Sequence, residues 1–406
     1  MTSAALLDLD ITGFAHGGEA IARHDGRVVF VSGAIPGERV RARLSDDSRS
    51  SFWRADAVDV LEASPHRRPH IWAEADISRD PADRVGGADL GHIELGHQRV
   101  IKRQVLQEAL DKFAGGGLDA PEVVGADDSD GTGWRTRVTL HVDDEGRVGP
   151  FAARSHRVIE TATLPLARPA IAEAVAGLEG LVEGRVSFVE PADGRVRVLP
   201  HAKAGARKNG GRRAPKSAPD AIIEEVAGRE FRLSARGFWQ VHPQAASTLH
   251  DVVVAMLRGR LDADATHLDL YGGVGLFSAA LTASGASDVI TVESDPRATS
   301  FARDNLADLD VDAVTARVDR YLAAPHEGAR TGAVVLDPPR SGAGRAVVES
   351  LNARDPETIV YVACDPVALA RDLGTFSGLG WSVEHMQAMD LFPHSHHFET
   401  VALLTR

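Results

Sequence analysis

The first 62 residues alternate apolar and polar positions in short runs. These runs lie at 7–11, 19–23, 27–32, 39–44 and 53–62. Asp25-Gly26 is a hairpin signal between the second and third runs. Five short strands within this length predict a small OB-like β-barrel over residues 1–62.

Residues 63–235 mix two periodicities. Residues 93–113 place apolar side chains on one broad helical face, and residues 170–181 predict a second helix. Between them, residues 134–159 alternate as paired strands do. We therefore predict a central α+β domain over 63–235, with a basic loop near its end.

From residue 236 onward, strand and helix patterns alternate. A helix is predicted at 243–261, and helices of suitable length separate most of the strands that follow. The predicted strands are 266–270, 288–292, 313–318, 333–336, 358–363, 382–389 and 398–404. This order predicts an α/β domain over 236–406. Its sheet would be doubly wound and mostly parallel, with the last two strands antiparallel at one edge.

Composition narrows the class of protein. The chain has 406 residues, 43% of them hydrophobic, and lacks any apolar run of membrane-spanning length. No signal peptide is visible, so we expect a cytoplasmic protein that does not enter membranes. A net charge of −13 argues against broad non-specific nucleic-acid binding. Residues 201–216 carry six Lys/Arg and no acid, which suits either a solvated linker or an RNA-contacting arm.

The chain has one cysteine, Cys364, between an apolar strand run and a predicted helix. Asp365 would be the N-cap of that helix and Pro366 its first residue. Free N–H groups and the helix dipole at such a position favour a thiolate. Local context leaves two interpretations open, a nucleophile and a buried structural cysteine.

Two loops at predicted strand ends carry candidate binding groups. Gly272, Gly273 and Gly275 permit a tight turn after the first strand, and Glu293 ends the second strand about 20 residues later. A carboxylate there accepts hydrogen bonds from ribose hydroxyls. The third dinucleotide glycine and the Walker lysine are absent, so S-adenosylmethionine fits better than a dinucleotide. A tight turn without ligand is the alternative.

Two further loops are candidates for the chemistry. Asp337, in Asp-Pro-Pro-Arg, leaves the fourth strand at the edge where ligands bind in open α/β folds. The segment 392–399 contains three histidines, but without nearby cysteine or carboxylate ligands we expect no metal there. Glu399 opens an apolar strand and is either a general base or a solvated strand start.

Together these motifs resemble the S-adenosylmethionine-dependent RNA 5-methyluridine methyltransferases, over nearly the whole chain. The barrel is similar to the family's TRAM domain, and 134–137 and 155–156 are similar to RNA-side motifs of its central domain. Further motifs match in order and spacing at 238–243, 269–277, 292–293, 336–342, 363–373 and 397–399. The resemblance implies a class I methyltransferase, Rossmann-like fold. It also implies an RNA substrate, either tRNA or rRNA.

The resemblance also implies roles for single residues. Cys364 matches the nucleophile that adds to C6 of uracil, and Glu399 the base that removes the C5 proton. The implied cofactor-binding residues are Gln240, Tyr271, Gly273, Glu293, Asp337 and, as a weaker match, Asp319. The stretch after the barrel matches the region that holds an iron–sulfur cluster in some family members. The cysteines that would bind the cluster are absent here, so we expect no cluster.

Three other functions remain as alternatives. Cytosine-C5 methyltransferases of this type usually carry a second cysteine on the Pro-Pro loop, and this loop has none. A non-catalytic RNA-folding factor and a methyltransferase for exocyclic amines are the other two. We expect a monomer.

Overall fold

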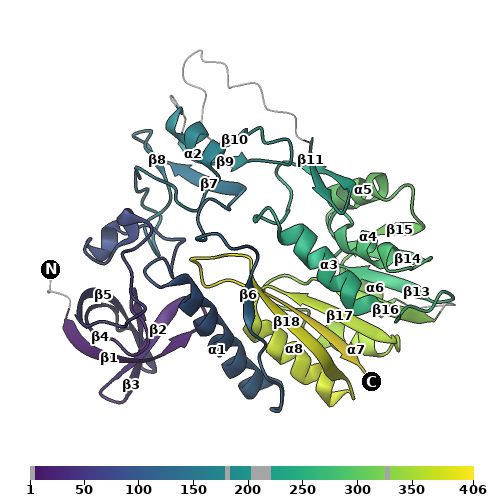
Figure 1. Ribbon diagram of the computed structural model, residues 1–406, viewed down its shortest axis with the longest axis horizontal. Helices are drawn as coiled ribbons and strands as arrows, with labels where there is room; N and C mark the ends of the chain where they lie inside the picture. Colours follow the sequence, from purple (N-terminus) through teal and green to yellow (C-terminus); the bar gives the residue numbers. More distant parts are fainter. Residues whose placement is uncertain (1–4, 179–182, 203–220, 325–329) are drawn as a thin grey trace.

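The computed structural model describes residues 5–178, 183–202, 221–324 and 330–406 (Figure 1). Most of the predicted basic loop 201–216 therefore lies outside the described residues. The N-terminal strands β1 (Leu6–Ala15), β2 (Glu19–His24), β3 (Arg27–Ser32), β4 (Arg39–Asp46) and β5 (Phe52–Glu62) form a closed barrel in the order β1-β2-β3-β5-β4. Alternating buried positions such as Val29 and Val31 fill it. The predicted five-stranded barrel is confirmed.

The C-terminal half is built on one eight-stranded sheet with the order β15-β14-β13-β16-β17-β19-β18-β6. Its parallel centre is made of β13 (Thr266–Leu270), β14 (Val289–Glu293), β15 (Val311–Thr315), β16 (Thr331–Leu336) and β17 (Thr358–Ala363). The long strands β18 (Ser382–Asp390) and β19 (Glu399–Thr405) pair antiparallel. The predicted α/β fold is confirmed.

Two details of the predicted sheet were wrong. β15 begins at Val311 and ends at Thr315, because Val318 already starts a helix, α6 (Val318–Ala323). The antiparallel pair does not form the edge, since the short strand β6 (Val123–Gly125) adds to β18 in parallel. β6 lies far upstream in the chain. A strand of three residues is too short to show the alternation of apolar and polar positions that predicts a strand.

Helices cover both faces of the sheet. The core on one face includes α3 (Ala245–Leu257), α4 (Leu276–Ala283) and α5 (Pro296–Asn305). The core on the other face includes α1 (Leu95–Phe113), α6, α7 (Arg345–Asn352) and α8 (Pro366–Gly378). The N-terminal part of α1 also contributes Ile101 and Val105 to the barrel core. Helix α1 therefore joins the barrel to the sheet (Figure 1).

The rest of the central segment forms a small layer above the sheet's edge in Figure 1. Its four strands are β7 (Arg137–Val142), β8 (Val148–Gly149), β9 (Gly184–Val189) and β10 (Arg197–Ala202), in the order β10-β9-β7-β8. α2 (Pro169–Ala176) packs on them through Ile171, and the short 3-10 helices Ala73–Ala75 and Pro81–Asp83 precede α1. The hairpin of β11 (Ala221–Val226) and β12 (Arg229–Ser234) then leads into α3.

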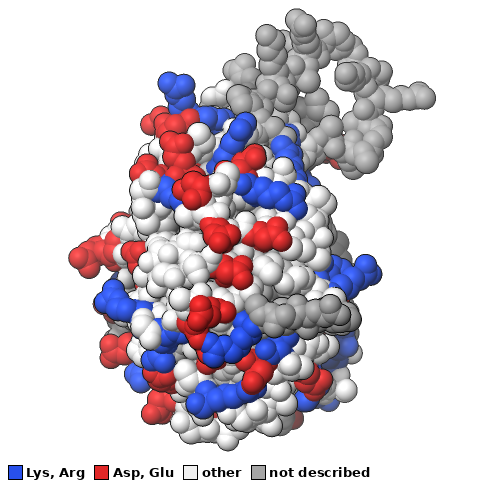
Figure 2. Space-filling model, turned by 90° about the vertical axis from the view of Figure 1, so that its right-hand side faces the viewer, with Lys and Arg blue, Asp and Glu red and all other residues white. Residues whose placement is uncertain are grey.

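The surface of this fold is mixed in charge. On the face shown in Figure 2, the acidic and basic side chains of the described residues lie interspersed, so these residues form no continuous basic surface there. No helix in the described part of the chain is long and apolar enough to cross a membrane.

Candidate active site

A cavity of about 1390 Å³ lies at the carboxyl ends of the parallel strands. This is the edge where α/β sheets bind ligands. The segment after β12 and the loop between β18 and β19 line its other side. The eight residues to which the resemblance assigns a catalytic or cofactor-binding role all line it: Gln240, Tyr271, Gly273, Glu293, Asp319, Asp337, Cys364 and Glu399. The fold thus brings together residues that span 160 positions of the chain, from Gln240 to Glu399.

The loop from β13 to α4 is bent tightly against the sheet. Tyr271, Gly273 and Gly275 all have positive φ, of 64°, 57° and 99°. The buried carboxylate of Asp269 accepts hydrogen bonds from the Ser278 backbone N–H (2.9 Å) and hydroxyl (2.6 Å), which anchors the start of α4. A side chain at Gly273 would meet no protein atom within 4 Å, so its backbone faces open space in the cavity.

Glu293 ends β14 beside this loop. It accepts hydrogen bonds from the backbone N–H groups of Gly273 (3.1 Å) and Asp295 (2.7 Å). These bonds fix the carboxylate at the cavity wall while its remaining lone pairs stay available for hydroxyl donors. An open glycine backbone beside an oriented carboxylate fits the ribose of a nucleoside cofactor. The residues present therefore fit S-adenosylmethionine.

Asp319 is less well placed to bind a ligand. It lies in the first turn of α6, and Arg317 donates two hydrogen bonds to it, of 3.0 and 2.9 Å. The side-chain hydrogen bond from Arg317 lowers the pKa of Asp319 despite some desolvation. Its charge is already balanced by Arg317. The side chain lies at the exposed rim of the cavity.

Of the residues proposed for the chemistry, Asp337 and Cys364 are half-buried and Glu399 is buried. Glu399 is 4% exposed, and burial, with a contribution from Asp337, raises its pKa well above the usual value. Burial and the nearby Asp269 raise the pKa of Asp337 to about 7. Arg340 acts in the opposite direction on Glu399. This part of the cavity therefore disfavours negative charge.

Cys364 is affected in the same way. Burial raises the pKa of its thiol to about 12, and Glu399 and Asp337 add to the shift. The expectation that its position at a helix start would favour a thiolate was wrong. Asp365 already accepts hydrogen bonds from the Val367 (3.0 Å) and Ala368 (2.8 Å) N–H groups. Few N–H groups in the first turn of α8 therefore remain to stabilise a thiolate at Cys364.

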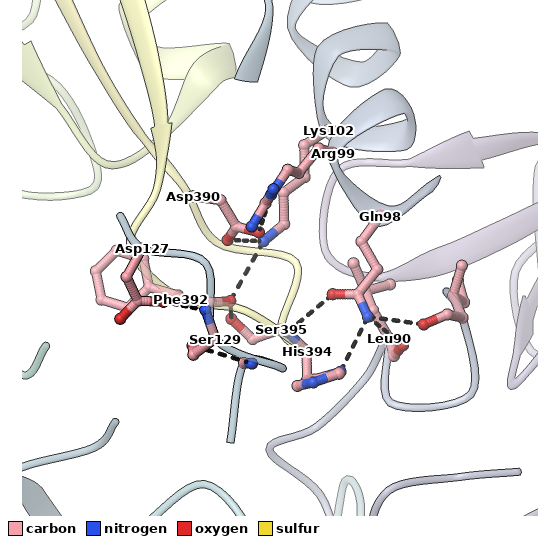
Figure 3. Close-up of polar contacts among 12 residues, drawn as sticks. Leu90, Gln98, Arg99, Lys102, Asp127, Ser129, Asp390, Phe392, His394 and Ser395 are labelled. Carbon is pink, nitrogen blue, oxygen red and sulfur yellow. Dashed lines mark hydrogen bonds and ion pairs between the residues drawn. The ribbon is translucent and has the colours of Figure 1, made fainter. Parts of the chain in front are cut away.

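The loop before β19 is held by two buried polar side chains of α1 (Figure 3). Gln98 Oε1 accepts a 2.8 Å hydrogen bond from the His394 N–H, and Gln98 Nε2 lies 2.9 Å from His394 Nδ1. Lys102, 2% exposed, donates to Asp390 Oδ1 (2.5 Å) and the Phe392 carbonyl (3.3 Å). These contacts hold His394 at a φ of 64° and fix the loop that leads into Glu399.

The three histidines of this loop have separate partners. His394 Nε2 lies 2.9 Å from the Asp130 carbonyl, His396 Nδ1 lies 2.7 Å from Asp89, and His397 lies 3.3 Å from Arg340. Among the described residues, no three His, Cys, Asp or Glu side chains are grouped to hold a metal ion. These histidines connect the loop to its surroundings.

Sequence reasoning missed Gln98, Lys102 and Asp390. A signal was present, because Gln98 and Lys102 lie at positions i and i+4 on the apolar face of the helix predicted at 93–113. Polar residues on such a face indicate buried partners. The partners lie almost 300 positions later, and the sequence pattern does not identify them.

Comparisons with known proteins agree with this architecture. Residues 327–406 match the family model "tRNA (Uracil-5-)-methyltransferase", and residues 6–58 match the TRAM domain. An RNA methyltransferase of Streptomyces avermitilis described as uncharacterized is 38% identical, over 98% of this chain and 97% of that protein. The 23S rRNA (uracil(1939)-C(5))-methyltransferase RlmD of Halomonas elongata is 32% identical, over 98% and 89%.

A solved structure shares the whole fold. It is the Pyrococcus abyssi tRNA (uracil-54, C5)-methyltransferase in complex with S-adenosyl-L-homocysteine, with a TM-score of 0.73 and 21% identity. The match covers 98% of this chain and 99% of that one. Barrel, central segment and sheet are therefore arranged in the same overall way in both proteins.

Proposed function

This chain belongs to the RNA uracil-5-methyltransferase family, and we propose that it methylates C5 of a uridine through a covalent adduct at Cys364. One observation supports this most: Cys364 and Glu399 line the same cavity as the glycine loop and Glu293. A nucleophile, a base and a nucleoside-binding loop thus open into one space. Bound S-adenosylmethionine would supply the methyl group, held by Tyr271, Gly273 and Glu293.

Cys364 overcomes the poor nucleophilicity of C5. As its sulfur bonds to C6 of uracil, the C5–C6 double-bond electrons move through C4 to O4, and the resulting enolate makes C5 nucleophilic. Burial raises the pKa of the thiol to about 12, so its proton must pass to water as the S–C6 bond forms, and the sulfur is reprotonated after it leaves C6.

Glu399 completes the reaction. After C5 has gained the methyl group, its proton must leave so that the C5–C6 double bond re-forms and the S–C6 bond breaks. Glu399 takes that proton. A carboxylate whose pKa burial raises well above the usual value is a stronger base once ionised than an exposed one.

The rest of the chain would hold the RNA. A uridine within folded RNA must leave its stack to reach the cavity. Gly87, Asp89, Trp134 and Arg135 of the central segment line the cavity. This segment and the TRAM barrel would bind the surrounding RNA by shape and phosphate contacts. Relatives act on uridines of both 23S rRNA and tRNA. Mass spectrometry of rRNA and tRNA from cells with and without the protein would identify the substrate.

The covalent step is tested with RNA containing 5-fluorouridine. Fluorine at C5 cannot leave as a proton does, so the protein should remain bonded to the RNA and migrate as a denaturant-resistant complex when S-adenosylmethionine is present. Cys364→Ala should abolish both this complex and methyl transfer while RNA binding is kept. Methyl transfer by Cys364→Ala would refute the covalent mechanism.

Glu399→Gln separates the two halves of the reaction. It should slow turnover by about 10²- to 10⁴-fold, the usual contribution of a general base, while the adduct with ordinary RNA accumulates. The product should be 5-methyluridine; 5-methylcytidine or an N-methylated base would support one of the alternative functions.

A further inference from the structure

The turn between β1 and β2 of the barrel reaches the start of the catalytic helix α8. His16 Nε2 in this turn lies 2.8 Å from Asp365 Oδ2. Asp365 is the residue after Cys364 and caps α8 through its other oxygen. One carboxylate therefore connects the N-terminal barrel to the backbone that carries the nucleophile.

A second contact fits the same turn against the loop before β19. A Cβ at Gly18 would lie 3.0 Å from Asp89 Cβ and 3.1 Å from His396 Nδ1, so the turn packs closely here. The rings of His16 and His396 meet edge to face with centroids 6.3 Å apart. His396 lines the catalytic cavity and pairs with Asp89. The barrel thus touches both the nucleophile's helix and the loop of the base.

We infer that His16 is a positioning residue for the methyl-transfer reaction. By holding the Asp365 carboxylate from the barrel side, it fixes the turn that aims the Cys364 sulfur at C6 of the substrate base. The barrel then contributes to the rate of the chemical step as well as to RNA binding. This inference rests on the proposed role of Cys364 as nucleophile.

The electrostatics of Asp365 are consistent with this role. Burial alone would raise its pKa, but hydrogen bonds from His16, Ala368 and Val367 outweigh burial and lower the pKa. The carboxylate stays charged and accepts three hydrogen bonds from two directions. The side chain of His16 is 35% exposed and that of Asp365 is 18% exposed, so the contribution of the pair is moderate.

The test measures RNA affinity and the single-turnover rate separately in the full chain. His16→Ala should lower the single-turnover rate of methyl transfer by about three- to tenfold, as expected for a partly exposed charge-assisted hydrogen bond, with RNA affinity within about twofold of wild type. His16→Gln, which keeps a donor, should recover part of the rate. His24→Ala is the matched control, since His24 lies in the same barrel and pairs with the exposed Asp25 at 3.6 Å.

A double-mutant cycle with Asp365→Asn makes the test specific. If His16 acts through Asp365, His16→Ala should slow Asp365→Asn little further. Additive losses, or a loss of RNA affinity at an unchanged rate, would overturn the inference and leave the barrel as an RNA-binding module. The His16 test is read from the rate of methyl transfer. Failure of the covalent mechanism would instead appear as a wild-type protein that methylates RNA but forms no adduct with 5-fluorouridine.

Discussion

The two walls of the cavity are built differently. The binding wall is made of Tyr271, Gly273, Glu293 and Asp319, which lie at or after the carboxyl ends of β13, β14 and β15 within about 50 residues of chain. The reaction wall is made of Asp337, Cys364 and the buried Glu399, and burial raises the pKa of all three groups.

The supports of the two walls differ as well. Glu293 is oriented by N–H groups of its own and the neighbouring loop. The loop that leads to Glu399 is instead held by Gln98 and Lys102, almost 300 positions earlier. Binding groups can thus be specified by local motifs, whereas groups that need a tuned pKa depend on long-range packing.

The largest effect is expected when Lys102, which holds the loop leading into the reaction wall, is replaced. Lys102→Met leaves Asp390 buried without its closest cation, and breaking a buried ion pair in this way costs about 3–5 kcal/mol. The free energy of unfolding in urea should fall by that amount. Lys112→Met is the control, because Lys112 is exposed on the same helix and should change stability by less than about 0.5 kcal/mol. Equal effects of the two variants would show that the buried pair does not support this wall.

The next effect tests the raised pKa of Cys364 in the reaction wall. Since the pKa of Cys364 is raised to about 12, the thiol stays protonated through pH 7–9, and its thiolate fraction grows about tenfold for each pH unit. Alkylation of the ligand-free protein by iodoacetamide should therefore rise about a hundredfold between pH 7 and pH 9. The chain has one cysteine, so the label reports this site alone. A rate that begins to level off near pH 9 would contradict the raised pKa, because an ordinary thiol with a pKa of about 8.5 behaves in that way; free cysteine provides that reference curve.

The smallest effect compares two carboxylates of the binding wall, Glu293 and Asp319. Glu293→Gln should weaken binding of S-adenosylmethionine about tenfold by calorimetry, because a charged acceptor for the ribose hydroxyls is lost. Asp319→Asn should change the affinity by less than about threefold, since Arg317 already engages this carboxylate. RNA affinity should stay unchanged in both variants. The reverse order of the two effects would move the ribose site toward α6.

The sequence by itself determined the fold class and part of the candidate site, whereas Gln240 and Asp319 were named only by the family resemblance. Period-two runs, glycines at sharp turns and alternating strands and helices are local signals, and the topology of a parallel sheet brings strand ends to one edge. For this reason Glu293, Asp337 and Cys364 could be placed together before the structure was known. The family resemblance then assigned roles to them.

Only the tertiary structure decided how these residues are tuned and held. The pKa of Cys364 depends on burial and on carboxyl groups that come from other strands. β6 at the sheet edge, Lys102 beneath the loop and His16 behind α8 are brought in from distant parts of the chain. Such contacts depend on how whole elements pack, and no local pattern of residues encodes them.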